Sequence, residues 1–139
     1  MNLYVGTTIG YLVCYFDINF TFSLKNNHVI NNNYLEETIC DLEVVDLDND
    51  GKQEILVLYF NKKIQIFKEI DDRHYELVAN VELKEVLNFP FCFATITEKE
   101  SSQIWFFATN AVYKYSLTNI DASFPNTNSD DIELEVMMV

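Results

Sequence analysis

The chain has 139 residues, of which 49% are hydrophobic, and its formal net charge is −13. This apolar fraction is sufficient for one domain with a hydrophobic core, and it excludes wholesale disorder. The nine basic residues are scattered along the chain, so the composition argues against nucleic acids and anionic membrane surfaces as partners.

Apolar side chains recur at every second position in short runs rich in Val, Ile, Phe and Tyr. This period is typical of half-buried β-strands. No run approaches the roughly 20 apolar residues of a membrane-spanning helix, so no direct membrane insertion is expected. In chain order, the expected strands are 2–7, 11–16, 20–24, 38–46, 54–60, 63–69, 75–82, 91–96, 103–108 and 111–117, with a short helical turn at 83–87.

One hairpin pattern occurs three times, at 3–16, 55–67 and 104–115, with polar or small residues between its two strands. The spacing of roughly 50 residues is in the range of β-propeller blades. A blade is a four-stranded antiparallel sheet, and only segment 38–82 contains four clear strands. The predicted fold is therefore all-β, a partial β-propeller of about two and a half four-stranded antiparallel blades over 1–117.

An arc of fewer than three blades stays open, because closed propellers typically have about four to eight. A protein partner or a second copy of the chain is expected to cover its open edges. The tail 118–139 is polar and acidic before it ends in an alternating segment, 132–138. This segment is expected as a fourth strand of the third blade, as a strand donated to a neighbour, or as a frayed terminus.

Carboxylates alternate with other residues in one loop, 46–54, between two expected strands. Ca²⁺ takes about six to eight oxygen ligands, and this loop can supply most of them. Gly51 allows the backbone reversal that gathers the carboxylates, whose mutual repulsion requires a counter-charge. The predicted ligands are the side chains of Asp46, Asp48, Asp50 and Glu54, the backbone carbonyl of Lys52, and water.

The loop also shares features with an EF-hand and with an ordinary acidic turn. An EF-hand requires a Glu at the twelfth loop position, but that residue is Val57, and both flanks have the pattern of strands rather than helices. The EF-hand is therefore excluded. An acidic hairpin turn that binds nothing remains as the alternative, because Asp, Asn and Gly are ordinary turn formers.

The stretch 44–57 resembles the calcium loop of FG-GAP (integrin-alpha-like, or VCBS) propeller repeats, in which an Asp-x-Asp-x-Asp-Gly-x-x-Asp loop joins two strands of a blade. The resemblance implies a structural Ca²⁺ held by the same five residues, with Glu54 at a position that is usually Asp. The Phe-Gly and Gly-Ala-Pro signatures of the family are absent. The order of blades also resembles an FG-GAP subunit of a lysosomal signalling scaffold, which implies a cytosolic partner complex.

No nucleotide-binding or catalytic motif is present, and His28 and His74 lie in polar, turn-like segments. No signal peptide is evident, so the expected location is cytoplasmic. We therefore expect a non-catalytic, calcium-stabilised protein-interaction scaffold or a subunit of a larger intracellular assembly. The alternative is an extracellular, integrin-like adhesion or ligand-binding fragment, which glycosylation at Asn19 would favour.

Overall fold

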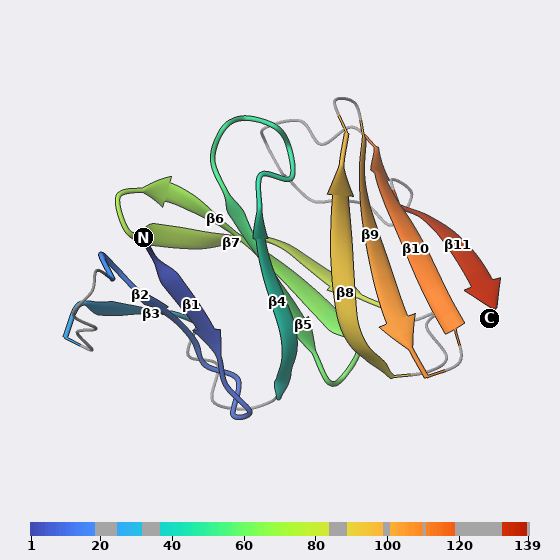
Figure 1. Cartoon of the computed structure of the whole chain (residues 1–139), viewed down its shortest axis with the longest axis horizontal. Helices are drawn as coiled ribbons and strands as arrows, with labels where there is room; N and C mark the ends of the chain where they lie inside the picture. Colours follow the sequence, from blue (N-terminus) through green and yellow to red (C-terminus); the bar gives the residue numbers. More distant parts are fainter. Residues whose placement is uncertain are drawn as a thin grey trace.

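The structure is a computed structural model that describes residues 1–18, 25–31, 37–83, 89–98, 101–109, 111–118 and 132–138. Within these residues the protein is all-β, which confirms the predicted class. Three antiparallel sheets lie side by side, and none of them closes on itself in the described part of the chain (Figure 1). The strand expected at 20–24, and the expected helical turn beyond Leu83, lie outside the described residues.

The three sheets follow one another along the chain. Sheet 1 has the order β1 (Leu3–Gly6), β2 (Leu12–Tyr15), β3 (Asn27–Asn31). Sheet 2 has the order β4 (Ile39–Val45), β5 (Glu54–Tyr59), β6 (Lys63–Asp71), β7 (His74–Glu82). Sheet 3 has the order β11 (Ile132–Met138), β10 (Ala111–Thr118), β9 (Ser101–Ala108), β8 (Pro90–Thr97).

Sheet 2 is buried on both faces, and every residue of its strand β5 is buried. Successive side chains of a strand point to opposite faces. Ile55 and Val57 accordingly join the apolar cluster shared with sheet 1, which includes Leu12. Leu56 and Leu58 join the cluster shared with sheet 3. Sheet 2 is thus the middle layer of the stack.

The edge strand β4 of sheet 2 and the edge strand β8 of sheet 3 run side by side (Figure 1). Two carboxylates of β4 accept hydrogen bonds from the backbone of β8. Phe93 N–H donates to Asp41 Oδ2 at 3.0 Å, and Thr95 N–H donates to Glu43 Oε2 at 3.0 Å. Because an edge strand presents unpaired backbone groups, these side chains satisfy donors that no neighbouring strand pairs in the described chain.

The alternating segment at the end of the chain pairs antiparallel with β10, from Ala111 opposite Met138 to Leu117 opposite Ile132. It therefore forms the fourth strand of sheet 3. Strand β3 was not expected, because Asn27, His28 and Asn31 give it a polar composition. Among the described residues there is no helix that could span a membrane.

Candidate metal site

The loop between β4 and β5 reverses the chain within a few residues. Asn49 has a φ of 58° and Gly51 a φ of 88°. Asn tolerates this left-handed region, and Gly adopts it without steric cost. The turn carries Asp48 and Asp50 between Asp46, which directly follows β4, and Glu54, which begins β5. The local sequence thus brings both ends of the loop together.

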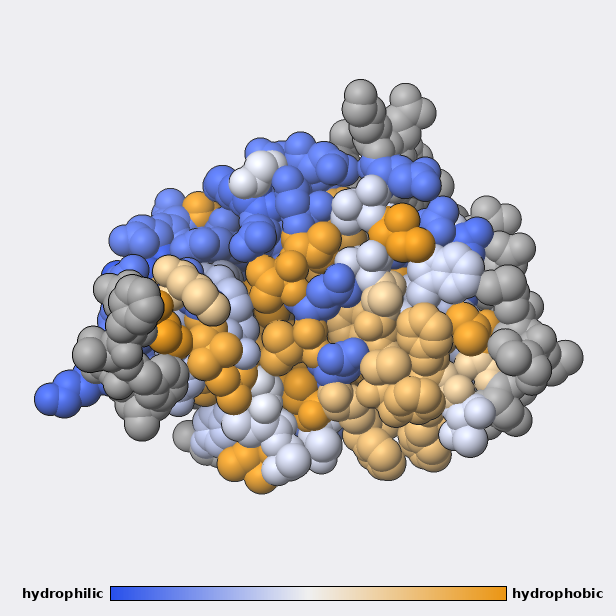
Figure 2. All heavy atoms as spheres, viewed as in Figure 1, coloured by the Kyte–Doolittle hydropathy of each residue, from blue (hydrophilic) through white to orange (hydrophobic). Residues whose placement is uncertain are grey.

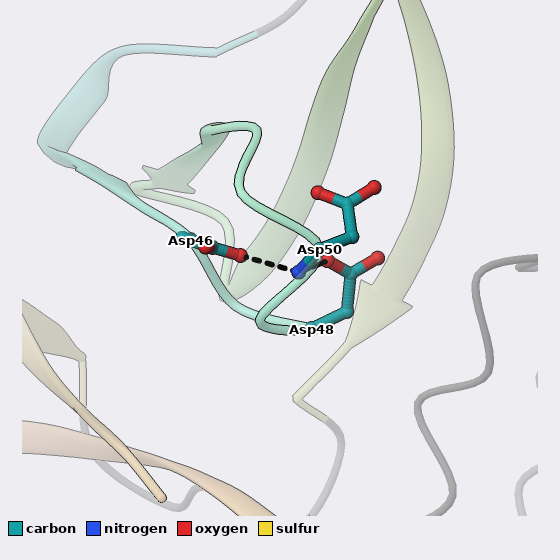
Figure 3. Close-up of side chains that lie close together, drawn as sticks. All are labelled: Asp46, Asp48 and Asp50. Atoms are coloured by element: carbon teal, nitrogen blue, oxygen red, sulfur yellow. Dashed lines mark hydrogen bonds between the residues drawn. The ribbon is translucent and has the colours of Figure 1, made fainter. Parts of the chain in front are cut away.

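Hydrogen bonds from the loop's own backbone hold its carboxylates. Asp46 accepts from Asp50 N–H through Oδ1 at 3.1 Å (Figure 3). It also accepts from Gly51 N–H through Oδ2 at 3.0 Å. Asp48 Oδ1 accepts from Asp50 N–H at 3.2 Å. One carboxylate oxygen from each of Asp46, Asp48 and Asp50 lies within 4.8 Å of the others. These three predicted ligands are therefore brought together.

Glu54 is completely buried, with 0% of its surface exposed. Its Oε2 accepts a hydrogen bond from Leu47 N–H at 2.8 Å, which fixes the carboxylate under the loop. Its Oε1 has no hydrogen-bond partner among the described residues. A buried carboxylate oxygen without a hydrogen bond is costly unless a cation compensates for it.

Lys68 is the residue of this site that sequence reasoning missed. It lies on β6 directly opposite Glu54. Its Nζ is 2.6 Å from Asp48 Oδ2, 2.7 Å from Asp50 Oδ2 and 3.3 Å from Glu54 Oε1. Three of the predicted ligands therefore converge on one cationic atom, which provides the counter-charge that the acidic cluster requires.

The charged groups of Lys68, Asp50 and Glu54 shift one another's pKa values. Burial by itself lowers the pKa of Lys68, but its hydrogen bonds to Asp48 and Asp50 outweigh that effect, so the pKa is raised. The hydrogen bond from Lys68 and the Lys52 N–H lower the pKa of Asp50. Burial raises the pKa of Glu54, although the Leu47 N–H and Lys68 oppose the shift. The network thus keeps Lys68 charged.

The remaining predicted ligand, Lys52, is exposed on the loop. Its N–H donates to Asp50 Oδ1 at 2.8 Å, and its predicted role as a carbonyl ligand stays a prediction. The donor set of four carboxylates is the oxygen chemistry that Ca²⁺ prefers. Together with the buried Glu54 Oε1, which has no hydrogen bond among the described residues, it fits a hard cation. The arrangement can bind one positive charge, and Lys68 Nζ lies where Asp48, Asp50 and Glu54 converge.

Contacts with sheet 3 hold the loop from the other side. Leu47 is fully buried in the cluster shared by sheets 2 and 3. The Ser102 hydroxyl donates to the Leu47 carbonyl at 2.6 Å, and Asn49 Nδ2 donates to the Glu98 carbonyl at 3.1 Å. A cation that orders this loop therefore also affects the junction between the two sheets.

No family model matches this chain, and neither a curated protein nor a solved structure is significantly similar to it. The fold and the site thus define an all-β protein of three stacked sheets with an acidic loop at one junction. The resemblance of 44–57 to the FG-GAP calcium loop stays a prediction.

Proposed function

We propose that this protein is a non-catalytic protein-interaction scaffold, a subunit of a larger intracellular assembly, whose β4–β5 loop is stabilised by Ca²⁺. One observation carries the calcium part of the proposal. Oxygen atoms of Asp48, Asp50 and the buried Glu54 converge on a single cation position. A hairpin turn needs no such convergence, because ordinary turns are held by backbone and Asx hydrogen bonds alone.

The bound ion would be structural. Asp48, Asp50 and Glu54 would hold it, with Asp46 and the Lys52 carbonyl as the further predicted ligands. An ion that binds only the folded loop stabilises the folded state by mass action. Since Leu47 and Ser102 tie the loop to sheet 3, this stabilisation would extend to the junction of the two sheets.

The propeller remains part of the proposal. Its support is the stacking of three antiparallel sheets, of which the middle one is buried on both faces. Strands β3, β7 and β11 each end their sheet in the described chain. A partial propeller of such sheets is open, and open edges favour pairing with another chain.

Exposed aromatic side chains support an interaction role. Phe60 and Phe89 stack with ring centroids 5.0 Å apart, although each is more than half exposed. Phe91, two residues further along the chain, is 57% exposed. Figure 2 shows hydrophobic residues over the middle of the face in view, around β4 and β8, while hydrophilic residues gather near the β4–β5 loop. Exposed aromatic groups of this kind are typical anchors of protein interfaces.

A non-catalytic role agrees with the state of the thiols. Burial raises the pKa of Cys14, Cys40 and Cys92. A raised thiol pKa disfavours the thiolate, which is the nucleophilic form. The acids of the loop are engaged with its backbone and with Lys68.

Thermal unfolding in Ca²⁺ and in EDTA tests the calcium part. We expect the melting temperature of the wild type to rise in Ca²⁺, and this rise to be lost in the double variant Asp46→Asn/Asp50→Asn. The matched control is Asp71→Asn/Asp72→Asn, which removes two exposed charges elsewhere and should keep the rise. A wild type whose melting temperature is the same in both solutions would contradict the proposal.

Light scattering tests the interaction part. One copy has a mass of 16.3 kDa. If the wild type has a mass larger than one copy, and this mass decreases in the double variant Phe60→Ser/Phe89→Ser, the partner is a second copy of the chain. A monomer would leave a different protein as the partner that the proposal requires. A larger mass that is unchanged in Phe60→Ser/Phe89→Ser would count against these two residues as the contact.

A further inference from the structure

Lys68 has an unusual position for a lysine in a β-strand. Its side chain is only 8% exposed, and it points from β6 under the neighbouring loop. Lysine is rarely buried without a partner, because taking its charge out of water is costly. Here the cost is offset by three carboxylates, of which Asp48 and Glu54 have side chains that are 1% and 0% exposed.

The same oxygen atoms cannot serve the ammonium and a metal ion at once. Asp48 Oδ2 and Asp50 Oδ2 are 2.6 Å and 2.7 Å from Nζ, which is the length of strong charge-assisted hydrogen bonds. Ca²⁺ needs oxygen atoms at about 2.3–2.6 Å. An ion held by these oxygens would lie in contact with Nζ, and the two positive charges would repel each other.

Resting on the proposed calcium site, we propose that Lys68 is a built-in counter-ion of the β4–β5 loop that must leave the cation position before a metal ion binds. The loop then has two neutralised states, one with Lys68 among the carboxylates and one with a metal ion among them. Lys68 thereby sets the metal affinity of the loop.

The apparent affinity follows from the population of the competent state. When a protein binds its ligand only from a minor state, the apparent dissociation constant rises in inverse proportion to that population. If Lys68 is withdrawn in about one molecule in ten or fewer, its removal tightens binding about tenfold or more. Exchange of Lys68 for an uncharged side chain is therefore expected to increase the affinity for the metal ion, whereas most changes near a binding site decrease it.

Calorimetric Ca²⁺ titration of wild type, Lys68→Met and Lys63→Met tests this inference. Met keeps the length of the side chain without its charge. Lys63 lies at the other end of the same strand, so its replacement removes an equal charge away from the loop. We expect Lys68→Met to bind about tenfold or more tightly than the wild type, and Lys63→Met to match the wild type.

The outcomes separate this inference from the proposed function. If the wild type binds and Lys68→Met binds no more tightly, the inference is overturned and the calcium site stands. If only Lys68→Met binds, Lys68 has permanently replaced the metal in the wild type, so both the displacement of Lys68 and the calcium function are overturned. If neither chain binds, both are overturned.

If Lys68→Met folds too poorly for titration, thermal unfolding tests the inference instead. Without its ammonium, the loop has carboxylates that lack a counter-charge. We expect Lys68→Met to melt well below the wild type in EDTA and to recover in Ca²⁺, even to the point of folding only when Ca²⁺ is added. Lys68→Arg, which retains the charge, should show no such dependence. A loss in Lys68→Met that Ca²⁺ does not restore would contradict the inference.

Chemical labelling tests the displacement in the wild type itself. An amine-acetylating reagent followed by mass spectrometry reports how accessible each lysine is. We expect Lys68 to be protected in EDTA and to become reactive in Ca²⁺, while the exposed Lys25 reacts equally in both solutions. Equal protection of Lys68 in EDTA and in saturating Ca²⁺ would overturn the inference.

Discussion

The two junctions on either side of sheet 2 are built from different chemistry. The junction with sheet 1 combines an apolar cluster with neutral hydrogen bonds, such as Tyr4 to Tyr75 at 3.0 Å and Asn31 to Tyr59 at 2.9 Å. Its ion pair between Arg73 and Asp17 lies at the exposed periphery. The junction with sheet 3 instead places the carboxylates of Asp41, Glu43 and the β4–β5 loop where they are partly or fully buried.

This difference locates the part of the molecule that responds to cations. Neutral hydrogen bonds and apolar contacts are little affected by salt, whereas the energies of charged groups depend strongly on their counter-charges. Chelation and substitutions of Lys68 should therefore act on the junction of sheets 2 and 3. Changes at the junction of sheets 1 and 2 should alter stability equally with and without a metal ion.

The largest effect is expected from Phe106→Ala, in the apolar cluster shared by sheets 2 and 3. Phe106 is 1% exposed, and its ring packs edge-on against Tyr115 with centroids 5.3 Å apart. Removing a buried phenyl ring costs about 3–5 kcal/mol. Urea unfolding should show this loss, while the control Phe91→Ala, at a site that is 57% exposed, should change little. Equal losses in the two variants would mean that Phe106 is not at a packed junction.

Asp41→Ala should have the next largest effect, because it removes a charged acceptor between the sheets. Asp41 Oδ2 accepts from Phe93 N–H, and Oδ1 accepts from Leu42 N–H at 2.9 Å. Loss of a hydrogen bond to a charged group costs about 1.5–3 kcal/mol. Hydrogen exchange should increase at Phe93 in particular. The control is Asp72→Ala, whose side chain is 96% exposed; unchanged exchange at Phe93 would count against the contact.

Ser102→Ala tests whether the loop and sheet 3 act together. The Ser102 hydroxyl is buried and donates to the Leu47 carbonyl, so its loss leaves that carbonyl without this partner. The expected cost is about 1–1.5 kcal/mol. The calcium-dependent rise in melting temperature should also change in this variant, because Ser102 contacts the loop and is not itself a predicted ligand. If the rise is unchanged, the loop does not couple to sheet 3 through this bond.

The strands with long hydrophobic runs could be predicted from the sequence. Strands β5 and β6 were expected at 54–60 and 63–69 and lie at Glu54–Tyr59 and Lys63–Asp71. Their hydrophobic runs reflect burial, which period and composition report directly. Strand β3 was not predicted, because its polar segment is held extended by pairing with β2. No apolar pattern in the sequence marks such a strand.

The acidic residues of the candidate site could be predicted from the sequence, but the lysine that neutralises them could not. Asp46, Asp48 and Asp50 are neighbours in the chain, so spacing alone indicates that they lie close together. Lys68 is 14 residues from Glu54 and comes from the next strand. The signal that could have found it is hairpin register: pairing Tyr59 with Lys63 places Glu54 opposite Lys68.

The smallest effect is expected from Tyr75→Phe, at the neutral junction. Loss of the hydroxyl contact with Tyr4 should cost about 0.5–1 kcal/mol at neutral pH, equally in Ca²⁺ and EDTA.

Burial raises the pKa of both Tyr75 and Tyr4. Because an unfolded tyrosine ionises near pH 10, their contribution is present below about pH 10 and is lost as the pH rises through the folded-state values. Tyr75→Phe removes one of these two ionisations, so urea unfolding between neutral and alkaline pH should show a smaller alkaline loss than in the wild type. An equal loss would mean that Tyr75 is already accessible to water, and that the neutral junction is looser than its contacts indicate.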